Sequence, residues 1–215
     1  MGGGLVARAT RSASGGLQLT LEDLAVPQTL EELEAVVKNC RKCPLAAGRT
    51  NVVFGEGNPH ALLMFIGEGP GAEEDRQGRP FVGPAGQLLD RILAACNIKR
   101  EEVYIANIVK CRPPGNRVPT KEEAEACLPY LIRQIELIRP KIIVLLGATA
   151  LQYLMGSGAR ITKVRGQWLG PFYGAQVMPT YHPAALLRDP SKKRPAWEDF
   201  KKIRDAYFNL KKQGL

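Results

Sequence analysis

The sequence predicts an α/β domain in which helices cover both faces of a parallel β-sheet. Four short, largely apolar runs, at residues 61–66, 102–107, 141–147 and 176–180, have the length of strands buried inside a domain. Segments with helical periodicity lie between consecutive runs, in the strand–helix–strand order that produces a parallel sheet. With 215 residues the chain is long enough for one such domain and its tails.

The N-terminal segment is predicted to be a tail that leads into a helix. Residues 1–26 are rich in Gly, Ala, Ser and Arg, and no acidic residue precedes Glu22. This composition, without any period, predicts a disordered basic tail and places the folded domain at residues 27–215. A transit-like peptide would share the composition but would need an amphipathic pattern, which this segment does not have. Thr29 and Glu32 then form a capping box, which predicts a helix start.

The loop after the first strand, at residues 67–83, is rich in glycine, proline and acidic residues. Such a loop lets main chain approach a ligand closely at the carboxyl end of a strand, although glycine spacing alone fits a structural loop equally well. It is not a dinucleotide-binding fingerprint, because proline follows Gly67-Glu68-Gly69 and no helix is expected to begin there. It is not a P-loop, since no Gly-Lys-Ser or Gly-Lys-Thr follows.

The remaining helices are predicted at residues 84–97, 120–138, 148–155 and 195–212. A second capping box, at Thr120, opens the helix at 120–138. Residues 160–173 interrupt the alternation of strands and helices and predict a small hairpin or loop excursion.

The charge balance favours a polyanionic partner. Thirty Lys and Arg against twenty-one Asp and Glu give a formal charge of +9. From Arg188 to the C-terminus the chain has nine basic and four acidic residues. A solvated helix face explains this excess of positive charge as well as DNA binding does. No apolar run approaches the roughly 18 residues of a membrane span. The protein is therefore expected to be soluble and cytoplasmic, without contact to a membrane.

Polar residues end three of the four predicted strands. Glu68 follows the first strand, Asn107 ends the second, and His182 follows the fourth. Parallel α/β sheets bind ligands at the carboxyl ends of their strands, so a common pocket is expected there. Each residue alone has an ordinary explanation, as a turn residue or a surface group.

The five cysteines argue against a disulfide framework, because no secretion signal is present, and leave metal binding, catalysis or ordinary burial as their roles. Cys40 and Cys43 form a C-x-x-C pair, Cys111 stands in a Pro-rich segment, and Cys127 lies in a predicted helix. Cys96 belongs to an apolar helical stripe and is excluded from any site. Spacing alone leaves zinc and an iron-sulfur cluster open, although the long gap after Cys43 argues against a zinc ribbon.

Four motifs together resemble the family 4 uracil-DNA glycosylases, the iron-sulfur class. They are Gly67-Glu68-Gly69-Pro70-Gly71, Gly78-Arg79-Pro80-Phe81-Val82-Gly83, Asn107-Ile108-Val109-Lys110-Cys111-Arg112-Pro113-Pro114 and His182-Pro183-Ala184-Ala185-Leu186-Leu187-Arg188. The resemblance covers residues 29–208 in the family's motif order. It implies a three-layer α/β/α sandwich around a four-stranded parallel sheet. It also implies a monofunctional DNA-repair enzyme that flips uracil out of DNA and hydrolyses its glycosidic bond.

The resemblance suggests a role for each motif residue, and the chemistry is consistent with it. Phe81 would stack on the flipped base, and Asn107 would match O4 and N3–H of uracil while mismatching cytosine. His182 would donate to O2 as the uracil anion leaves, whereas His60 precedes the first strand and is expected at the surface. Glu68 is a candidate for orienting water, and main-chain groups of Gly69 share that assignment.

The same resemblance implies a [4Fe-4S] cluster held by Cys40, Cys43, Cys111 and Cys127, with zinc as the less favoured metal. Arg188 and the basic C-terminal helix are expected to contact DNA phosphates. The expected partner is uracil-containing DNA, bound by a monomer that associates with the nucleoid.

Two alternative functions remain at this point. A related subclass is trapped covalently on the abasic sugar through a His in a loop after the Asn motif, but no His lies between Asn107 and Cys127. The other is a metal-stabilised module that recognises lesions without cutting DNA, and the intact set Glu68, Phe81, Asn107 and His182 argues against it.

Overall fold

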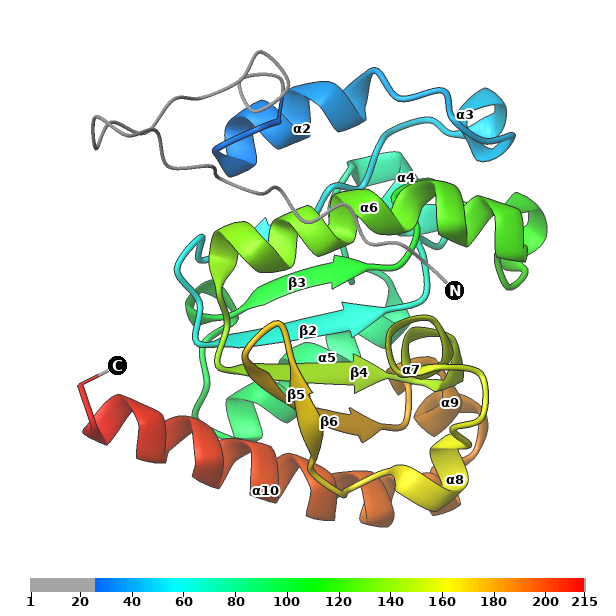
Figure 1. Cartoon of the computed structure of the whole chain (residues 1–215). Coiled ribbons are helices and arrows are strands. Elements are labelled where there is room, and N and C mark those ends of the chain that lie inside the picture. Colours follow the sequence, from blue (N-terminus) through cyan, green and yellow to red (C-terminus); the bar gives the residue numbers. More distant parts are fainter. Residues whose placement is uncertain (1–25, 215) are drawn as a thin grey trace, which may run out of the picture.

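The computed structural model describes residues 26–214, which form a three-layer arrangement of helices, sheet and helices (Figure 1). The predicted basic tail, apart from its last residue, lies outside the described residues. No helix within residues 26–214 combines the length and the apolar character needed to cross a membrane.

The sheet has six strands in the order β1-β3-β2-β4-β6-β5. The strands are β1 (Glu56–Gly57), β2 (Leu63–Gly67), β3 (Tyr104–Asn107), β4 (Ile142–Leu146), β5 (Leu169–Phe172) and β6 (Ala175–Thr180). The four strands predicted from sequence are β2, β3, β4 and β6, and all are parallel neighbours as expected. The sheet has two more strands than the four predicted: β1 and β5, which pair antiparallel at its edges. Both are short and partly exposed, so their apolar patterns are weak.

Helices cover both faces of the sheet because the central strands present apolar side chains on each face. In β2, Met64 and Ile66 belong to one hydrophobic core, whereas Leu63 and Phe65 belong to the other. The first core is covered by α2 (Leu30–Lys38), α6 (Lys121–Ile138) and α7 (Ala148–Met155), and the second by α5 (Pro84–Ala95) and α10 (Lys193–Lys212). The unbroken apolar runs of the sequence reflect this burial on both faces.

Local capping signals begin two helices where they were expected. Thr29 accepts a hydrogen bond from the Glu32 main-chain N–H at 3.2 Å. Thr120 accepts from the Glu123 N–H at 3.3 Å, while the Glu123 carboxylate accepts from the Thr120 N–H at 2.8 Å. These contacts satisfy main-chain donors that have no partner within the helix.

Several short helices lie in segments predicted as loops. They are α3 (Leu45–Gly48), α4 (Ala72–Gln77), α8 (Ile161–Val164), α9 (Pro183–Arg188) and the 3₁₀ turns Arg100–Glu102, Pro114–Asn116 and Pro190–Lys192. The expectation that no helix follows the Gly67-Glu68-Gly69 loop is wrong, since α4 begins at Ala72. Glu74 starts this helix by accepting from the Gly71 N–H at 3.1 Å, a contact that substitutes for a side-chain N-cap. The expected excursion at residues 160–173 contains α8 and then β5, and β5 pairs antiparallel with β6, which lies beyond that segment.

Candidate active site

A cavity of about 830 Å³ lies at the carboxyl ends of the parallel strands. The residues predicted to form a site all line it: Glu68, Gly69, Phe81, Asn107, His182 and Arg188. Glu68 and Gly69 follow β2, Phe81 lies between α4 and α5, and Asn107 ends β3. His182 lies between β6 and α9, and Arg188 ends α9. The parallel register places these ends side by side, with Gly67 of β2 opposite Asn107 of β3. His60, by contrast, is exposed in the turn before β2, as expected.

Phe81 is held in a fixed position at the cavity wall. Its φ of +51° lies in the left-handed region, which is uncommon for an aromatic residue, and it is 5 % exposed. Arg100 donates to the carbonyl oxygens of Pro80 at 2.5 Å and Phe81 at 3.2 Å. The main-chain N–H groups of the next two residues, Val82 and Gly83, donate to the Glu74 carboxylate at 2.9 and 2.8 Å. The aromatic ring is therefore pre-positioned at the expense of local backbone strain.

The side chain of Asn107 faces the cavity with an unused acceptor. It is 1 % exposed, and its Oδ1 finds no hydrogen-bond partner within residues 26–214. A buried amide oxygen without a partner is costly, and such atoms in native proteins usually await a ligand or water. Asn107 can therefore accept a hydrogen bond from a planar ring held in this cavity.

His182 is arranged as a neutral hydrogen-bond donor. Its Nδ1 accepts from the Ala184 main-chain N–H at 3.1 Å, so the single proton of the neutral ring belongs on Nε2. Burial, together with the positive charge of Arg188, lowers the His182 pKa to about 4. The imidazole lies against Phe81, with ring centroids 5.5 Å apart and planes inclined by 30°.

Glu68 is joined to a residue that the sequence analysis missed. The hydroxyl of Thr149, in the first turn of α7, donates a short hydrogen bond to Glu68 Oε2. Thr149 follows β4, the one parallel strand for which the sequence analysis named no polar residue at the carboxyl end. The rule that identified Asn107 and His182 would have found Thr149 as well.

The rim of the cavity carries basic side chains. Arg117, Arg188 and Lys192 line it, and Tyr181 lies beneath two cations, with Arg165 at 5.3 Å and Lys192 at 5.8 Å from its ring centroid. Arg165 is itself paired with the buried carboxylate of Asp199 on α10. Arg117 is paired with Glu123 and Lys192 with Asp189, so Arg188 is the cation of this set that has no carboxylate partner among the described residues and could attract an anionic ligand.

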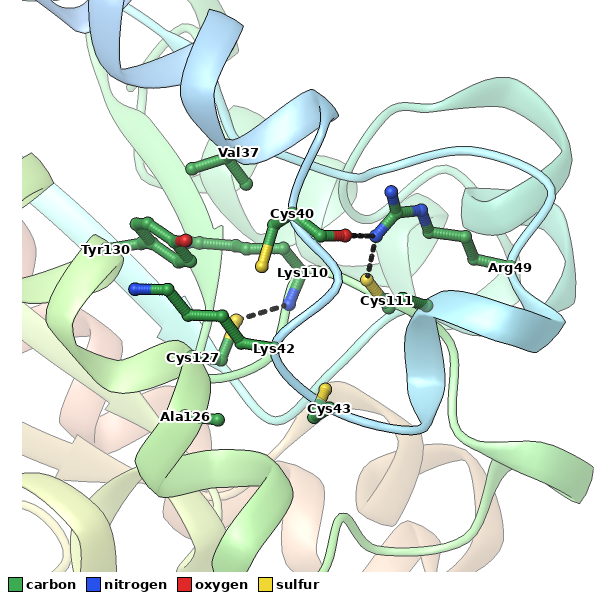
Figure 2. A pocket seen from close by; sticks show the side chains of 11 residues that line it. Val37, Cys40, Lys42, Cys43, Arg49, Lys110, Cys111, Ala126, Cys127 and Tyr130 are labelled. Carbon is green, nitrogen blue, oxygen red and sulfur yellow. Dashed lines mark hydrogen bonds between the residues drawn. The ribbon is translucent and has the colours of Figure 1, made fainter.

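The four predicted metal ligands line a second, smaller cavity. Figure 2 shows Cys40, Cys43, Cys111 and Cys127 with their sulfur atoms directed toward a common space between α2, α3 and α6. Within residues 26–214, no three Cys, His, Asp or Glu side chains are close enough together to hold one metal ion. Cys96 is elsewhere, fully buried beside α10 in the other core, and its burial raises its pKa to about 11.

Two of the four sulfur atoms accept hydrogen bonds from basic residues. Arg49 donates to Cys111 Sγ at 3.3 Å and to the Cys40 carbonyl oxygen at 2.8 Å. The main-chain N–H of Lys110 donates to Cys127 Sγ at 3.3 Å. Burial raises the pKa of both the Cys111 and Cys127 thiols. Arg49 was not identified from the sequence, because it is 62 positions away from Cys111 along the chain.

Comparison with known proteins links this site to DNA repair. A profile of the Uracil DNA glycosylase superfamily matches residues 54–201. The type-4 uracil-DNA glycosylase of Thermotoga maritima is 52% identical over 196 residues, which cover 86% of this chain and 99% of that protein. The type-4 enzyme of Sulfurisphaera tokodaii is 48% identical over 87% of this chain and 89% of its own length. The type-5 uracil-DNA glycosylase of Pyrobaculum aerophilum is 30% identical over 180 residues, which cover 69% of this chain and 79% of that protein.

Proposed function

This chain belongs to the uracil DNA glycosylase superfamily, and within it to the type-4 uracil-DNA glycosylases; from that membership we infer that it removes uracil from DNA by hydrolysing the glycosidic bond. The reaction leaves an abasic site and belongs to base excision repair. The roles of individual residues and the identity of the metal group are proposals, which the geometry of the two cavities supports.

Asn107 and Phe81 are proposed to select the base. A uracil flipped into the cavity would stack on the Phe81 ring and place N3–H at the unpaired Asn107 Oδ1. The amide N–H of Asn107 would then donate to O4. Cytosine carries an acceptor at N3 and a donor at C4, so both contacts would become mismatches in a buried site. One fixed amide can thus exclude the normal base.

His182 is proposed to stabilise the departing uracil anion. Negative charge develops on O2 as the glycosidic bond breaks, and a donor that meets it there stabilises the transition state more than the ground state. The hydrogen bond from Ala184 supports this role, because it leaves Nε2–H as the donor. The low pKa keeps the ring neutral at physiological pH, so it does not need to lose a proton before uracil binds.

Glu68 is proposed to orient the attacking water or to steady the cationic sugar. The Thr149 hydroxyl occupies one carboxylate oxygen and leaves the other to face the cavity. Main-chain groups of Gly69 line the same wall and are proposed to share the task.

The four thiols are proposed to hold a [4Fe-4S] cluster. All four cysteines line one cavity, and the resemblance of their motifs to the iron-sulfur family favours the cluster over zinc. The N–H···S contacts from Arg49 and Lys110 are of the kind that tune such clusters. When bound, the group would cross-link the Pro-rich segment to the chain after α2 and to α6.

Arg188 and Lys192 are proposed to bind DNA phosphates at the entrance.

The unpaired, buried Oδ1 of Asn107, in the cavity that Phe81 and His182 also line, is the observation that carries this assignment. The direct test is excision from an oligonucleotide with one uracil, compared with the same strand carrying cytosine. Cleavage at the resulting abasic position on alkaline heating is expected for uracil alone. Binding without excision would favour a lesion-recognition module, and protein attached to the product strand would favour the covalently trapped subclass.

A further inference from the structure

Lys110 is a fully buried cation that lies between the two sites. Its side chain is 1 % exposed, and it stands between Asn107 and the neighbouring Cys111 in the chain. The ammonium donates to the main-chain oxygen of Asn107 at 3.0 Å and to Gln134 Oε1 at 2.5 Å. Both acceptors are neutral. A buried ammonium without a carboxylate partner is expensive compared with an apolar chain of the same shape, so stability alone does not explain this residue.

Gln134 is held so that its oxygen faces Lys110. Its amide nitrogen donates to the Phe54 carbonyl oxygen at 3.0 Å and to the Tyr104 hydroxyl at 3.2 Å. Rotating the amide by half a turn would place its NH₂ group against the ammonium and break both contacts. The acceptor for Lys110 is therefore fixed by two further segments of the fold.

Helix α6 holds Lys110 from both ends. Gln134 receives the ammonium, and Cys127, about two helical turns earlier on the same helix, receives the main-chain N–H of Lys110 at 3.3 Å. The Lys110 carbonyl oxygen accepts from the Val53 N–H at 2.8 Å. Any shift of Lys110 would consequently move either the Asn107 carbonyl or the Cys127 contact.

We propose that Lys110 is a positioning residue that couples the base-recognition site to the cysteine site: its ammonium fixes the main chain of Asn107, and its main chain fixes Cys127. The inference rests on the proposed function, because it takes Asn107 as the residue that reads the base. The coupling would help keep the Asn107 amide aligned, since its Oδ1 has no hydrogen-bond partner among the described residues. It also predicts that altering Lys110 changes both sites.

The test uses the full-length protein with its metal group and the variant Lys110→Met, which keeps an unbranched chain but removes the ammonium. Single-turnover excision of uracil at saturating enzyme should fall about 10–100-fold, the range for losing a supporting contact behind a functional residue. The dissociation constant for abasic product DNA should change less than about threefold, because phosphate contacts lie elsewhere. The midpoint potential or the electron paramagnetic resonance spectrum of the cluster should shift, because a nearby charge is lost.

Two further variants separate positioning from general destabilisation. Ile203→Ala removes buried volume from the opposite core and should lower the melting temperature while leaving excision and spectrum unchanged. Gln134→Leu leaves Lys110 in place but removes its acceptor, and it should reduce excision in the same direction with iron retained. If Lys110→Met does not fold, the excision rate of Gln134→Leu tests the positioning role instead.

Excision within about twofold of wild type in Lys110→Met or Gln134→Leu would overturn the proposal, as would a loss no larger than that of an equally destabilised Ile203→Ala protein. An unchanged cluster spectrum in Lys110→Met would overturn the coupling. Wild-type protein that holds iron yet excises no uracil would instead refute the proposed function, which is a distinguishable result.

Discussion

A Cβ atom added to Gly67 would lie 2.5 Å from Asn107 Oδ1, closer than unbonded atoms approach. The same atom would lie 2.6 Å from the Phe81 ring. The absence of a side chain at the end of β2 therefore allows the amide and the ring to face one cavity. Gly67 has no positive φ, so its requirement is close approach rather than backbone conformation.

Gly67→Ala should lower uracil excision by about 10²-fold, because displacing Asn107 and Phe81 by a fraction of an ångström spoils the alignment of the base. The change is measured as the single-turnover rate on a uracil oligonucleotide. Gly170→Ala, where an added Cβ meets nothing within 4 Å, is the matched control and should retain wild-type activity. A normal rate in Gly67→Ala would show that the two side chains do not need this spacing.

Asn107→Asp should reduce uracil excision steeply and weaken the preference for uracil over cytosine. The carboxylate keeps an acceptor for N3–H but loses the donor to O4, and when protonated it can donate toward cytosine. Rates on paired uracil and cytosine oligonucleotides measure the change. Nearly full activity with an unchanged base preference would contradict the role assigned to Asn107.

His182→Ala should lower the single-turnover rate by about 10²–10³-fold, the range for losing one donor to a developing oxyanion. Binding to uracil-containing DNA should change far less. Arg188→Gln is the contrasting variant: Arg188 is exposed at the rim, so its loss should reduce the slope of log affinity against log salt by about 1 and leave the chemical step intact. Weaker binding with an unchanged rate at saturation in His182→Ala would refute the assignment.

His182 should also make folding stability depend on pH. Burial lowers its pKa from 6.5 to about 4, so the unfolded chain takes up the proton first as the pH falls. Stability from the neutral ring is complete above pH 6.5 and is lost between pH 6.5 and 4, by about 3 kcal/mol in total. The free energy of unfolding of the wild type, minus that of His182→Gln, should therefore decrease across this window in denaturant titrations. A difference that stays constant with pH would exclude a lowered pKa.

Cys111→Ser should lose the metal group and lower the melting temperature, because a bound cluster contributes to folding. Cys96→Ser should retain it, since Cys96 lies in the other core. Iron and acid-labile sulfide per chain, with visible absorption of anaerobically purified protein, measure both outcomes. Stoichiometric zinc without iron in the wild type would contradict the cluster.

The sequence by itself determined the parallel core of the sheet, the capped starts of α2 and α6, and the meeting of Glu68, Asn107 and His182 at one edge. These features follow from local signals, since burial on both faces produces an unbroken apolar run and parallel strands end at the same edge. The edge strands β1 and β5 and the helix α4 were missed because short, half-exposed segments carry little hydrophobic pattern.

The tertiary structure decided which polar groups support the site. The sequence assigns no role to Lys110, and only the approach of Gln134 and Asn107 shows it to be buried and hydrogen-bonded. Likewise, Thr149 contacts Glu68 across 81 positions of the chain. Such contacts join segments that are remote in the chain, so their energies depend on burial and geometry that no local pattern contains.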